Sequence, residues 1–236
     1  MELDASVLRS RRVQAFVALA AAVVAWFVVA PHLAYPGARS AVAIAAVAVL
    51  PGTLGLVYVA LPIWNRRRLF VAAIVLVLVA VGCAQAGWGL PGNFAKLGAA
   101  VFAGWAFLRL FEELSWVVIV AVIIPFVDAI SVWRGPTHAI TTHHIEVYTS
   151  VAVAFVVPGG YAAYLGPPDV LFFALFLAAA LRWNLRPAWT WLGMTGMYSL
   201  TIVVAYIFDV GGLPALPFLS FGFLVANADL LWRRLR

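Results

Sequence analysis

The sequence predicts an all-α membrane protein, a polytopic bundle of about eight transmembrane helices or, at most, nine. The chain is 66% hydrophobic with a mean hydropathy of +1.05. Only 10% of its residues are charged, whereas soluble domains carry about 25%. The apolar residues form runs of roughly the length, about 20 residues, that a helix needs to cross a bilayer. Short basic clusters lie between these runs, as they do in membrane proteins.

The expected spans follow in order along the chain, each defined to within a few residues at its ends. They are 13–30, 41–62, 69–87, 94–111, 115–133, 168–183, 188–208 and 214–232. Turn residues separate most of them: Pro and Gly at 31–37 and 87–92, and charged residues at 65–68. The stretch at 108–116 contains no Gly or Pro, so one long bent helix is the alternative there. Its charges favour a tight turn.

The basic residues predict the orientation of the chain. With the N-terminus in the cytoplasm, 12 of the 15 Lys and Arg residues lie inside and three, Arg39, Lys96 and Arg134, lie outside. This pattern predicts an integral protein of the cell membrane with both termini cytoplasmic. It also accounts for the net charge of +6 without a nucleic-acid partner. The Arg-rich, Ala/Val-rich composition is associated with prokaryotic proteins.

We find no internal repeat and no linker, so residues 1–236 are expected to form a single transmembrane domain. Residues 1–112 supply the N-terminal helices, and 113–236 carry every motif described below. The single cysteine, Cys83, excludes an intrachain disulfide and a thiolate metal cluster, and we interpret it as a packing residue.

Three histidines invite a metal interpretation. His138, His143 and His144 lie in one loop, and Glu146 could add a ligand. A solvated, pH-responsive loop is the interpretation we favour, because zinc normally needs three or four ligands and no cysteine lies near. We therefore predict no metal and no other cofactor.

Four aspartates lie in or beside the spans. An ionised carboxylate at mid-membrane costs at least about 2.5–3.5 kcal/mol, so such residues are candidates for function. Asp209 is expected at the water interface, and Asp229 is expected to pair with Arg233, one helical turn on. Asp128 lies near the end of the fifth span and Asp169 begins the sixth. Since successive spans run antiparallel, these two carboxylates should face each other at one side of the membrane.

Paired carboxylates suit a particular chemistry. Two that lie close together can share one proton. The ionised one then activates a water molecule, and the protonated one donates to a leaving group.

Three motifs resemble those of the presenilin and signal peptide peptidase family, the GxGD-type intramembrane aspartyl proteases. They are FVDAISVWRGP (126–136), LGPPDVLFFALF (165–176) and LPALPFLSFGF (213–223), all within residues 115–232. The resemblance implies a presenilin-like fold and hydrolysis of transmembrane or membrane-anchored peptides without a cofactor. It implies Asp128 and Asp169 as the catalytic dyad. The substrate-binding positions that it implies are Gly166, Pro214, Ala215 and Leu216.

The chain departs from the family pattern at two positions. Val127 stands where the family usually has Tyr, and Pro168 replaces the second glycine of Gly-x-Gly-Asp. Proline fixes φ and lacks an N–H, so the loop before Asp169 differs from the family's loop. Two alternative functions therefore stay open. One is a non-catalytic relative that binds membrane helices, and the other is a proton- or cation-coupled transporter or channel using both aspartates.

The segment before the second aspartate differs from the spans. Residues 147–157, VYTSVAVAFVV, are β-branched and aromatic and stop at Pro158-Gly159-Gly160. At 11 residues the segment is short for a crossing helix, and its composition favours extended structure. A strand over 151–157 could pair with a substrate helix once it has unwound. A re-entrant or interfacial segment is the alternative.

Overall fold

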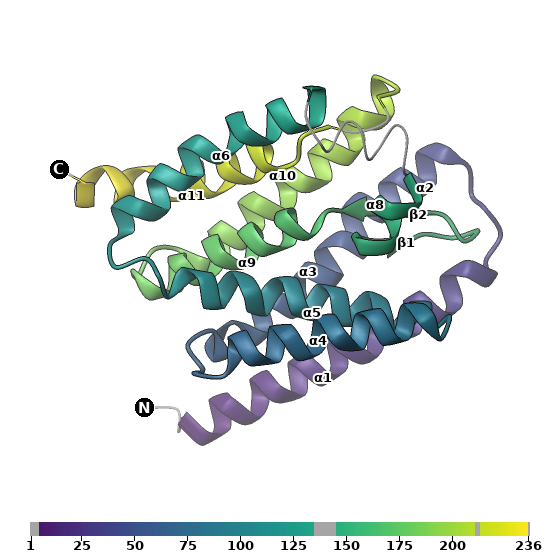
Figure 1. Cartoon of the computed structure of the whole chain (residues 1–236), viewed down its shortest axis with the longest axis horizontal. Helices are drawn as coiled ribbons and strands as arrows, with labels where there is room; N and C mark the ends of the chain where they lie inside the picture. Colours follow the sequence, from purple (N-terminus) through teal and green to yellow (C-terminus); the bar gives the residue numbers. More distant parts are fainter. Residues whose placement is uncertain (1–4, 135–144, 211–212, 236) are drawn as a thin grey trace.

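The computed structural model describes residues 5–134, 145–210 and 213–235, with side chains described between residues 11 and 234. These residues form a helical bundle with one small hairpin (Figure 1). The helices are α1 (Ala5–Val29), α2 (Ala38–Ile44), α3 (Leu50–Ala60), α4 (Leu69–Gln85), α5 (Gly89–Leu108), α6 (Leu114–Arg134), α8 (Ile145–Val151), α9 (Pro167–Arg182), α10 (Pro187–Ile207) and α11 (Leu216–Leu235). The strands are β1 (Val153–Val156) and β2 (Ala162–Leu165).

The chain is a helical membrane protein, as its composition predicted. Within the described ranges, four helical segments are long and apolar enough to cross a bilayer. They are Arg11–His32, Ala38–Ile63, Leu114–Arg134 and Pro187–Ile207. Large apolar side chains cover the outside of the bundle; Leu78 on α4 and Phe126 on α6 are 66% and 68% exposed. Each predicted span overlaps helical structure, but how many of the helices cross the bilayer stays a prediction.

Helix α9 forms the centre of the bundle. It lies between α5 on one side and α10, α11 and α6 on the other (Figure 1). All residues from Phe173 to Ala180 are fully buried, as in a helix surrounded by other helices. Gly104 on α5 allows the closest approach, because a Cβ there would lie 2.2 Å from the carbonyl oxygen of Leu171. The helix that carries Asp169 is therefore held tightly along its length.

Of two predicted breaks between spans, one is confirmed and the other is wrong. The chain does turn between α5 and α6, at 109–113, so the single long bent helix is excluded. The Gly/Pro loop predicted at 87–92 is wrong, because α5 already begins at Gly89. Pro91 sits in the first turn of α5, where its missing N–H costs no helical hydrogen bond. Gly92 lets α5 approach α4, since a Cβ there would lie 3.2 Å from the Cβ of the buried Cys83.

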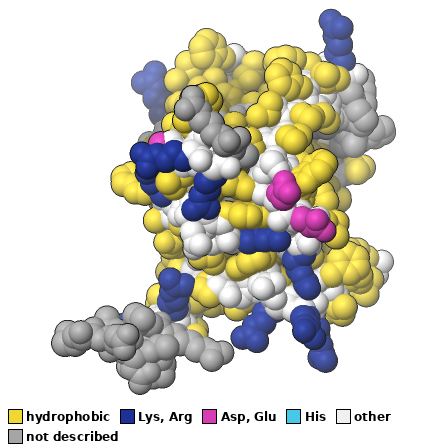
Figure 2. Space-filling model, turned by 90° about the vertical axis from the view of Figure 1, so that its left-hand side faces the viewer, with side chains coloured by type: hydrophobic (Ala, Val, Ile, Leu, Met, Phe, Trp, Pro, Cys, Tyr) yellow, Lys and Arg dark blue, Asp and Glu magenta, His cyan; other side chains and the backbone are white. Residues whose placement is uncertain are grey.

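The predicted cytoplasmic arginines meet at one end of the bundle. Hydrogen bonds to backbone carbonyl oxygens join the segments that carry them: Arg109 donates to Arg67 (3.4 Å), Arg182 to Leu108 (2.9 Å) and Arg234 to Trp183. Figure 2 looks onto this end, where Lys and Arg side chains spread over the surface. We call it the basic end. Its position fits the positive-inside pattern, and the side of the membrane that it faces stays a prediction.

The segment before Asp169 is part helix and part strand. Extended structure over all of 147–157 is wrong, because Ile145–Val151 is helical. There, the hydroxyl groups of Thr149 and Ser150 donate to backbone carbonyls three residues back, which satisfies acceptors within this short helix. The strand prediction holds for Val153–Val156. It pairs antiparallel with β2, which the sequence analysis missed.

Candidate active site around Asp128 and Asp169

Asp169 occupies the third position of α9, at the helix N-terminus. Gly166 is the N-cap, and its backbone N–H donates to Oδ2 of Asp169 at 2.9 Å. The backbone N–H of Asp169 donates back to the carbonyl oxygen of Gly166 at 3.1 Å. This reciprocal arrangement is half of a capping box, and a carboxylate is favoured there by the helix dipole.

The two prolines before Asp169 fit this geometry. Pro167 and Pro168 take the first two helical positions, where a backbone N–H has no acceptor within the helix. Gly166 has φ −64° and ψ 155°, a conformation open to any residue. What glycine provides here is space, because a Cβ would lie 3.3 Å from Oδ2 of Asp169. The Gly-Pro-Pro-Asp sequence thus builds a well-capped helix start.

Asp128 lies on α6 and is held by the start of α11. Its Oδ2 accepts a hydrogen bond of 3.0 Å from the backbone N–H of Leu216. Leu216 is the first residue of α11, so this N–H is one of the donors that a helix leaves unpaired. Pro125, three residues before Asp128, cannot donate within α6 and interrupts its hydrogen-bond ladder beside the carboxylate.

The Pro-Ala-Leu segment is buried beside Asp128. Pro214, Ala215 and Leu216 are all buried, and the backbone carbonyl of Ala215 accepts a hydrogen bond from the N–H of Leu219. The structure therefore brings the first and third predicted motifs into direct contact. Both carboxylates are bound in the same way, each accepting an N–H at the N-terminus of a helix.

The two aspartates lie close enough to interact electrostatically. The negative charge of Asp128 acts on the carboxyl group of Asp169, and α6 contacts α9. Both side chains are half-buried. In each carboxylate only Oδ2 is used, so Oδ1 has no hydrogen bond to a described residue. The pair therefore has acceptors left for water or a ligand.

Two tyrosines complete the surroundings, and the sequence analysis missed both. Burial and the negative charges of Asp169 and Asp128 raise the pKa of Tyr148 to about 12, so its phenol stays protonated at neutral pH. The fully buried Tyr198 on α10 donates its O–H to the backbone carbonyl of Asp169 at 2.8 Å. A buried tyrosine usually finds such a partner. The polar run Tyr198-Ser199 within an apolar span was the signal available in the sequence.

The hairpin leads directly into the site, since β2 ends at Leu165, next to Gly166. The outer edge of β1 is occupied: the side chain of Asn93 bonds both the N–H (2.8 Å) and the C=O (2.9 Å) of Ala154, and Trp26 donates to Val156. Because backbone groups alternate in direction along a strand, the N–H and C=O groups of Ala162 and Tyr164 point away from β1. No described residue forms a hydrogen bond with these N–H and C=O groups of Ala162 and Tyr164.

Other candidate residues lie apart from this pair. Asp209 is exposed with φ 49°, and its position at the water interface stays a prediction. Asp229 pairs with Arg186 at 2.7 Å instead of Arg233, because α10 begins beside the end of α11. His138, His143 and His144 lie outside the described residues. Within the described part of the chain, no group of three or more His, Cys, Asp or Glu side chains could hold a metal ion.

Comparison with known proteins leaves this geometry as the main guide to function. No protein-family model, no curated protein and no solved structure matches the chain.

Proposed function

We propose that the chain is an intramembrane aspartyl protease in which Asp128 and Asp169 are the catalytic dyad. One observation carries the proposal: three motifs far apart in the sequence converge, since Asp128 bonds to the Pro-Ala-Leu segment and its helix, α6, contacts α9, which carries Asp169. Such a pair of half-buried carboxylates, each with one oxygen that bonds to no described residue, is costly in an apolar protein unless it has a function.

The proposed reaction needs only water and the dyad. The two carboxyl groups share one proton. The ionised carboxylate takes a proton from water while the water oxygen bonds to the carbonyl carbon of the scissile peptide. The protonated carboxyl then donates its proton to the peptide nitrogen as the C–N bond breaks, which releases a carboxylic acid and an amine. The fold that supports this reaction is, in our proposal, presenilin-like, with about eight spans and both termini in the cytoplasm.

The proposed substrate is a transmembrane or membrane-anchored peptide. In a helix its peptide bonds are shielded, so it must unwind before cleavage. The outward N–H and C=O groups of Ala162 and Tyr164 offer pairing partners to the extended segment. This assigns to β2 the role that the sequence suggested for 151–157, since the outer edge of β1 is occupied by Asn93. Gly166, Pro214, Ala215 and Leu216 lie around the cleavage position in this proposal.

A second candidate has one specific observation in its favour. Each carboxylate already serves the structure, Asp169 by capping α9 and Asp128 by binding the first N–H of α11. A non-catalytic relative that binds membrane helices would keep both aspartates for those hydrogen bonds alone.

Substitution of the aspartates separates the two candidates. Asparagine keeps an oxygen that accepts the Gly166 or Leu216 N–H but cannot ionise, whereas alanine removes the acceptor as well. We expect Asp128→Asn and Asp169→Asn to fold and bind a helical membrane peptide but to lose about 10²–10⁴-fold in cleavage rate. Asp209→Asn is the matched control, because Asp209 is exposed and asparagine tolerates its positive φ.

The measurement is cleavage of a helical membrane peptide by the purified protein in lipid vesicles, beside crosslinking of that peptide to the protein. Wild-type crosslinking without cleavage would favour the non-catalytic relative. Equal cleavage by wild type and both asparagine variants would exclude the dyad. A pH-driven cation flux that either substitution abolishes would instead indicate the transporter or channel.

A further inference from the structure

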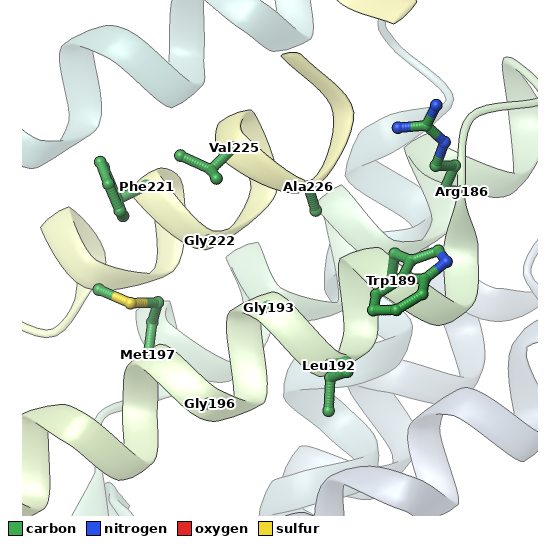
Figure 3. Close-up of a pocket in the computed structure, with 10 residues that line it drawn as sticks. All are labelled: Arg186, Trp189, Leu192, Gly193, Gly196, Met197, Phe221, Gly222, Val225 and Ala226. Atoms are coloured by element: carbon green, nitrogen blue, oxygen red, sulfur yellow. The ribbon is translucent and has the colours of Figure 1, made fainter. Parts of the chain in front are cut away.

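A groove runs between α10 and α11 on the outside of the bundle, away from the two aspartates. Its volume is about 550 Å³, within the range of small-molecule sites. Figure 3 shows Gly193, Gly196 and Gly222 along it, with Trp189 and Arg186 at one end. Its opposite end reaches Met197 and Phe221.

Glycines create the floor of this groove. Gly193 and Gly222 bring the two helices together, because a Cβ on Gly222 would lie 2.7 Å from the carbonyl oxygen of Gly193. Gly196 faces open space, since a Cβ there would meet nothing within 4 Å. Leu192 and Phe221 form walls and are 52% and 57% exposed. The result is an apolar channel between two ridges of side chains.

The length of the groove corresponds to one leaflet of a bilayer. From Arg186 to Met197 the chain rises by about 16 Å at 1.5 Å per helical residue. The hydrocarbon core of a bilayer is about 30 Å thick, so the groove spans about half of it. A docked transmembrane helix would need a surface along both leaflets, whereas one acyl chain fits this length.

The end of the groove carries positive charge. Arg182, Arg186, Arg233 and Arg234 lie at this end of α9, α10 and α11, against the single acid Asp229. Trp189, 64% exposed, lies in the first turn of α10, and aromatic residues at the ends of membrane helices typically meet lipid headgroups. Basic pockets between membrane helices are typical sites for anionic headgroups.

We propose that this groove binds an anionic phospholipid. One acyl chain lies over Gly196 between Leu192 and Phe221, and the phosphate lies beside Arg186. This site is independent of the proposed protease function, because it uses neither aspartate of the dyad and lies toward the other end of α10 and α11.

Native mass spectrometry of the full chain tests the proposal. The protein in detergent is incubated with equal amounts of dioleoylphosphatidylglycerol and dioleoylphosphatidylcholine, and the retained lipids are counted. We expect wild type to retain the anionic lipid in preference. Gly196→Leu fills the groove and should lower retention several-fold. Gly82→Leu is the matched control, since Gly82 is also an exposed helical glycine with nothing within 4 Å of a Cβ.

Charge substitutions test the headgroup without changing the glycine contact between α10 and α11. Asp229→Asn frees the Arg186 guanidinium, which is held by two 2.7 Å hydrogen bonds, and should raise retention of the anionic lipid. The double variant Arg186→Gln/Asp229→Asn leaves the net charge unchanged and should lower it. Equal retention of both lipids by wild type, or equal retention by Gly196→Leu and Gly82→Leu, would overturn the proposal. So would a wild-type dimer that Gly196→Leu dissociates, because a second copy would then cover the groove.

Discussion

The two ends of the bundle use opposite charges for the same physical task. Helices α5, α9 and α11 all run toward the basic end. The carbonyl groups of their last turns have no partner within the helix. There, Arg182 donates to Leu108 at the end of α5, and Arg234 donates to Trp183 at the end of α9. At the other end, the N-termini of α9 and α11 leave N–H groups unpaired, and Asp169 and Asp128 accept them.

The two ends differ in how many hydrogen-bonding groups of their charged side chains are left over after the helix ends are satisfied. At the basic end the arginines close turns of the chain, and this supports structure and topology. At the carboxylate end each aspartate bonds to described residues through a single oxygen, which leaves a polar site beside the hairpin. We infer that the basic end serves mainly stability, while the carboxylate end serves chemistry at some cost to stability. Substitutions at either end, and in the contact between α5 and α9, can break this division.

Gly104→Ala should have the largest effect. The new Cβ would lie 2.2 Å from the carbonyl oxygen of Leu171, and neither backbone can move without separating α5 from α9. We expect a loss of about 3 kcal/mol or more in stability, measured as a lower thermal midpoint in detergent. Gly82→Ala, on the exposed side of α4, is the control and should leave the midpoint unchanged. An unaltered midpoint in Gly104→Ala would mean that α5 and α9 are not packed this closely.

Arg182→Gln should weaken the basic end only. The half-buried Arg182 donates to Leu108 at 2.9 Å and lies 4.4 Å from the centre of the Trp183 ring. Losing a charged hydrogen bond and this stacking should cost about 2 kcal/mol, while cleavage per folded molecule stays the same. Arg66→Gln serves as the control, because Arg66 is exposed. A fall in cleavage without a fall in stability would contradict the division between the ends.

Ala162→Pro should affect only the carboxylate end. Proline removes the outward N–H of the first residue of β2 and spares the pairing with β1. We expect about a tenfold slower cleavage, equal to about 1.4 kcal/mol, without a change in thermal midpoint. Ala162→Val keeps the N–H and should cleave like wild type. Equal rates for both variants would show that the substrate does not pair with β2.

The helices were predictable from the sequence because a bilayer requires apolar runs of about 20 residues, with charged residues between them. The turn between α5 and α6 followed from Glu112 and Glu113, and the meeting of Asp128 with Asp169 at one end followed from the alternating direction of the spans. The start of α5 was misplaced because proline looks the same in a loop and in the first turn of a helix.

What the sequence could not reveal are contacts that depend on packing. The strand β2 escaped prediction because its four residues, AAYL, carry no clear pattern and gain their structure from pairing with β1. The pairing of Asp229 with Arg186 links residues 43 positions apart, and local spacing favoured Arg233. Tyr148 lies near the aspartates because residues 145–151 form the helix α8. The β-branched residues of this segment favoured a strand instead.

Tyr148→Phe should give the smallest effect, confined to alkaline solution. In the unfolded chain this phenol ionises near pH 10, whereas in the folded protein its pKa is about 12. The folded state therefore holds more protons between about pH 10 and about pH 12, so this phenol makes stability fall as the pH rises through that window. The thermal midpoint of wild type should decline more steeply there than that of Tyr148→Phe, with Tyr161→Phe on the exposed hairpin turn as the control. Parallel declines in all three proteins would mean that Tyr148 does not lie beside the two carboxylates, and the carboxylate end would then lack the phenol that distinguishes it from the basic end.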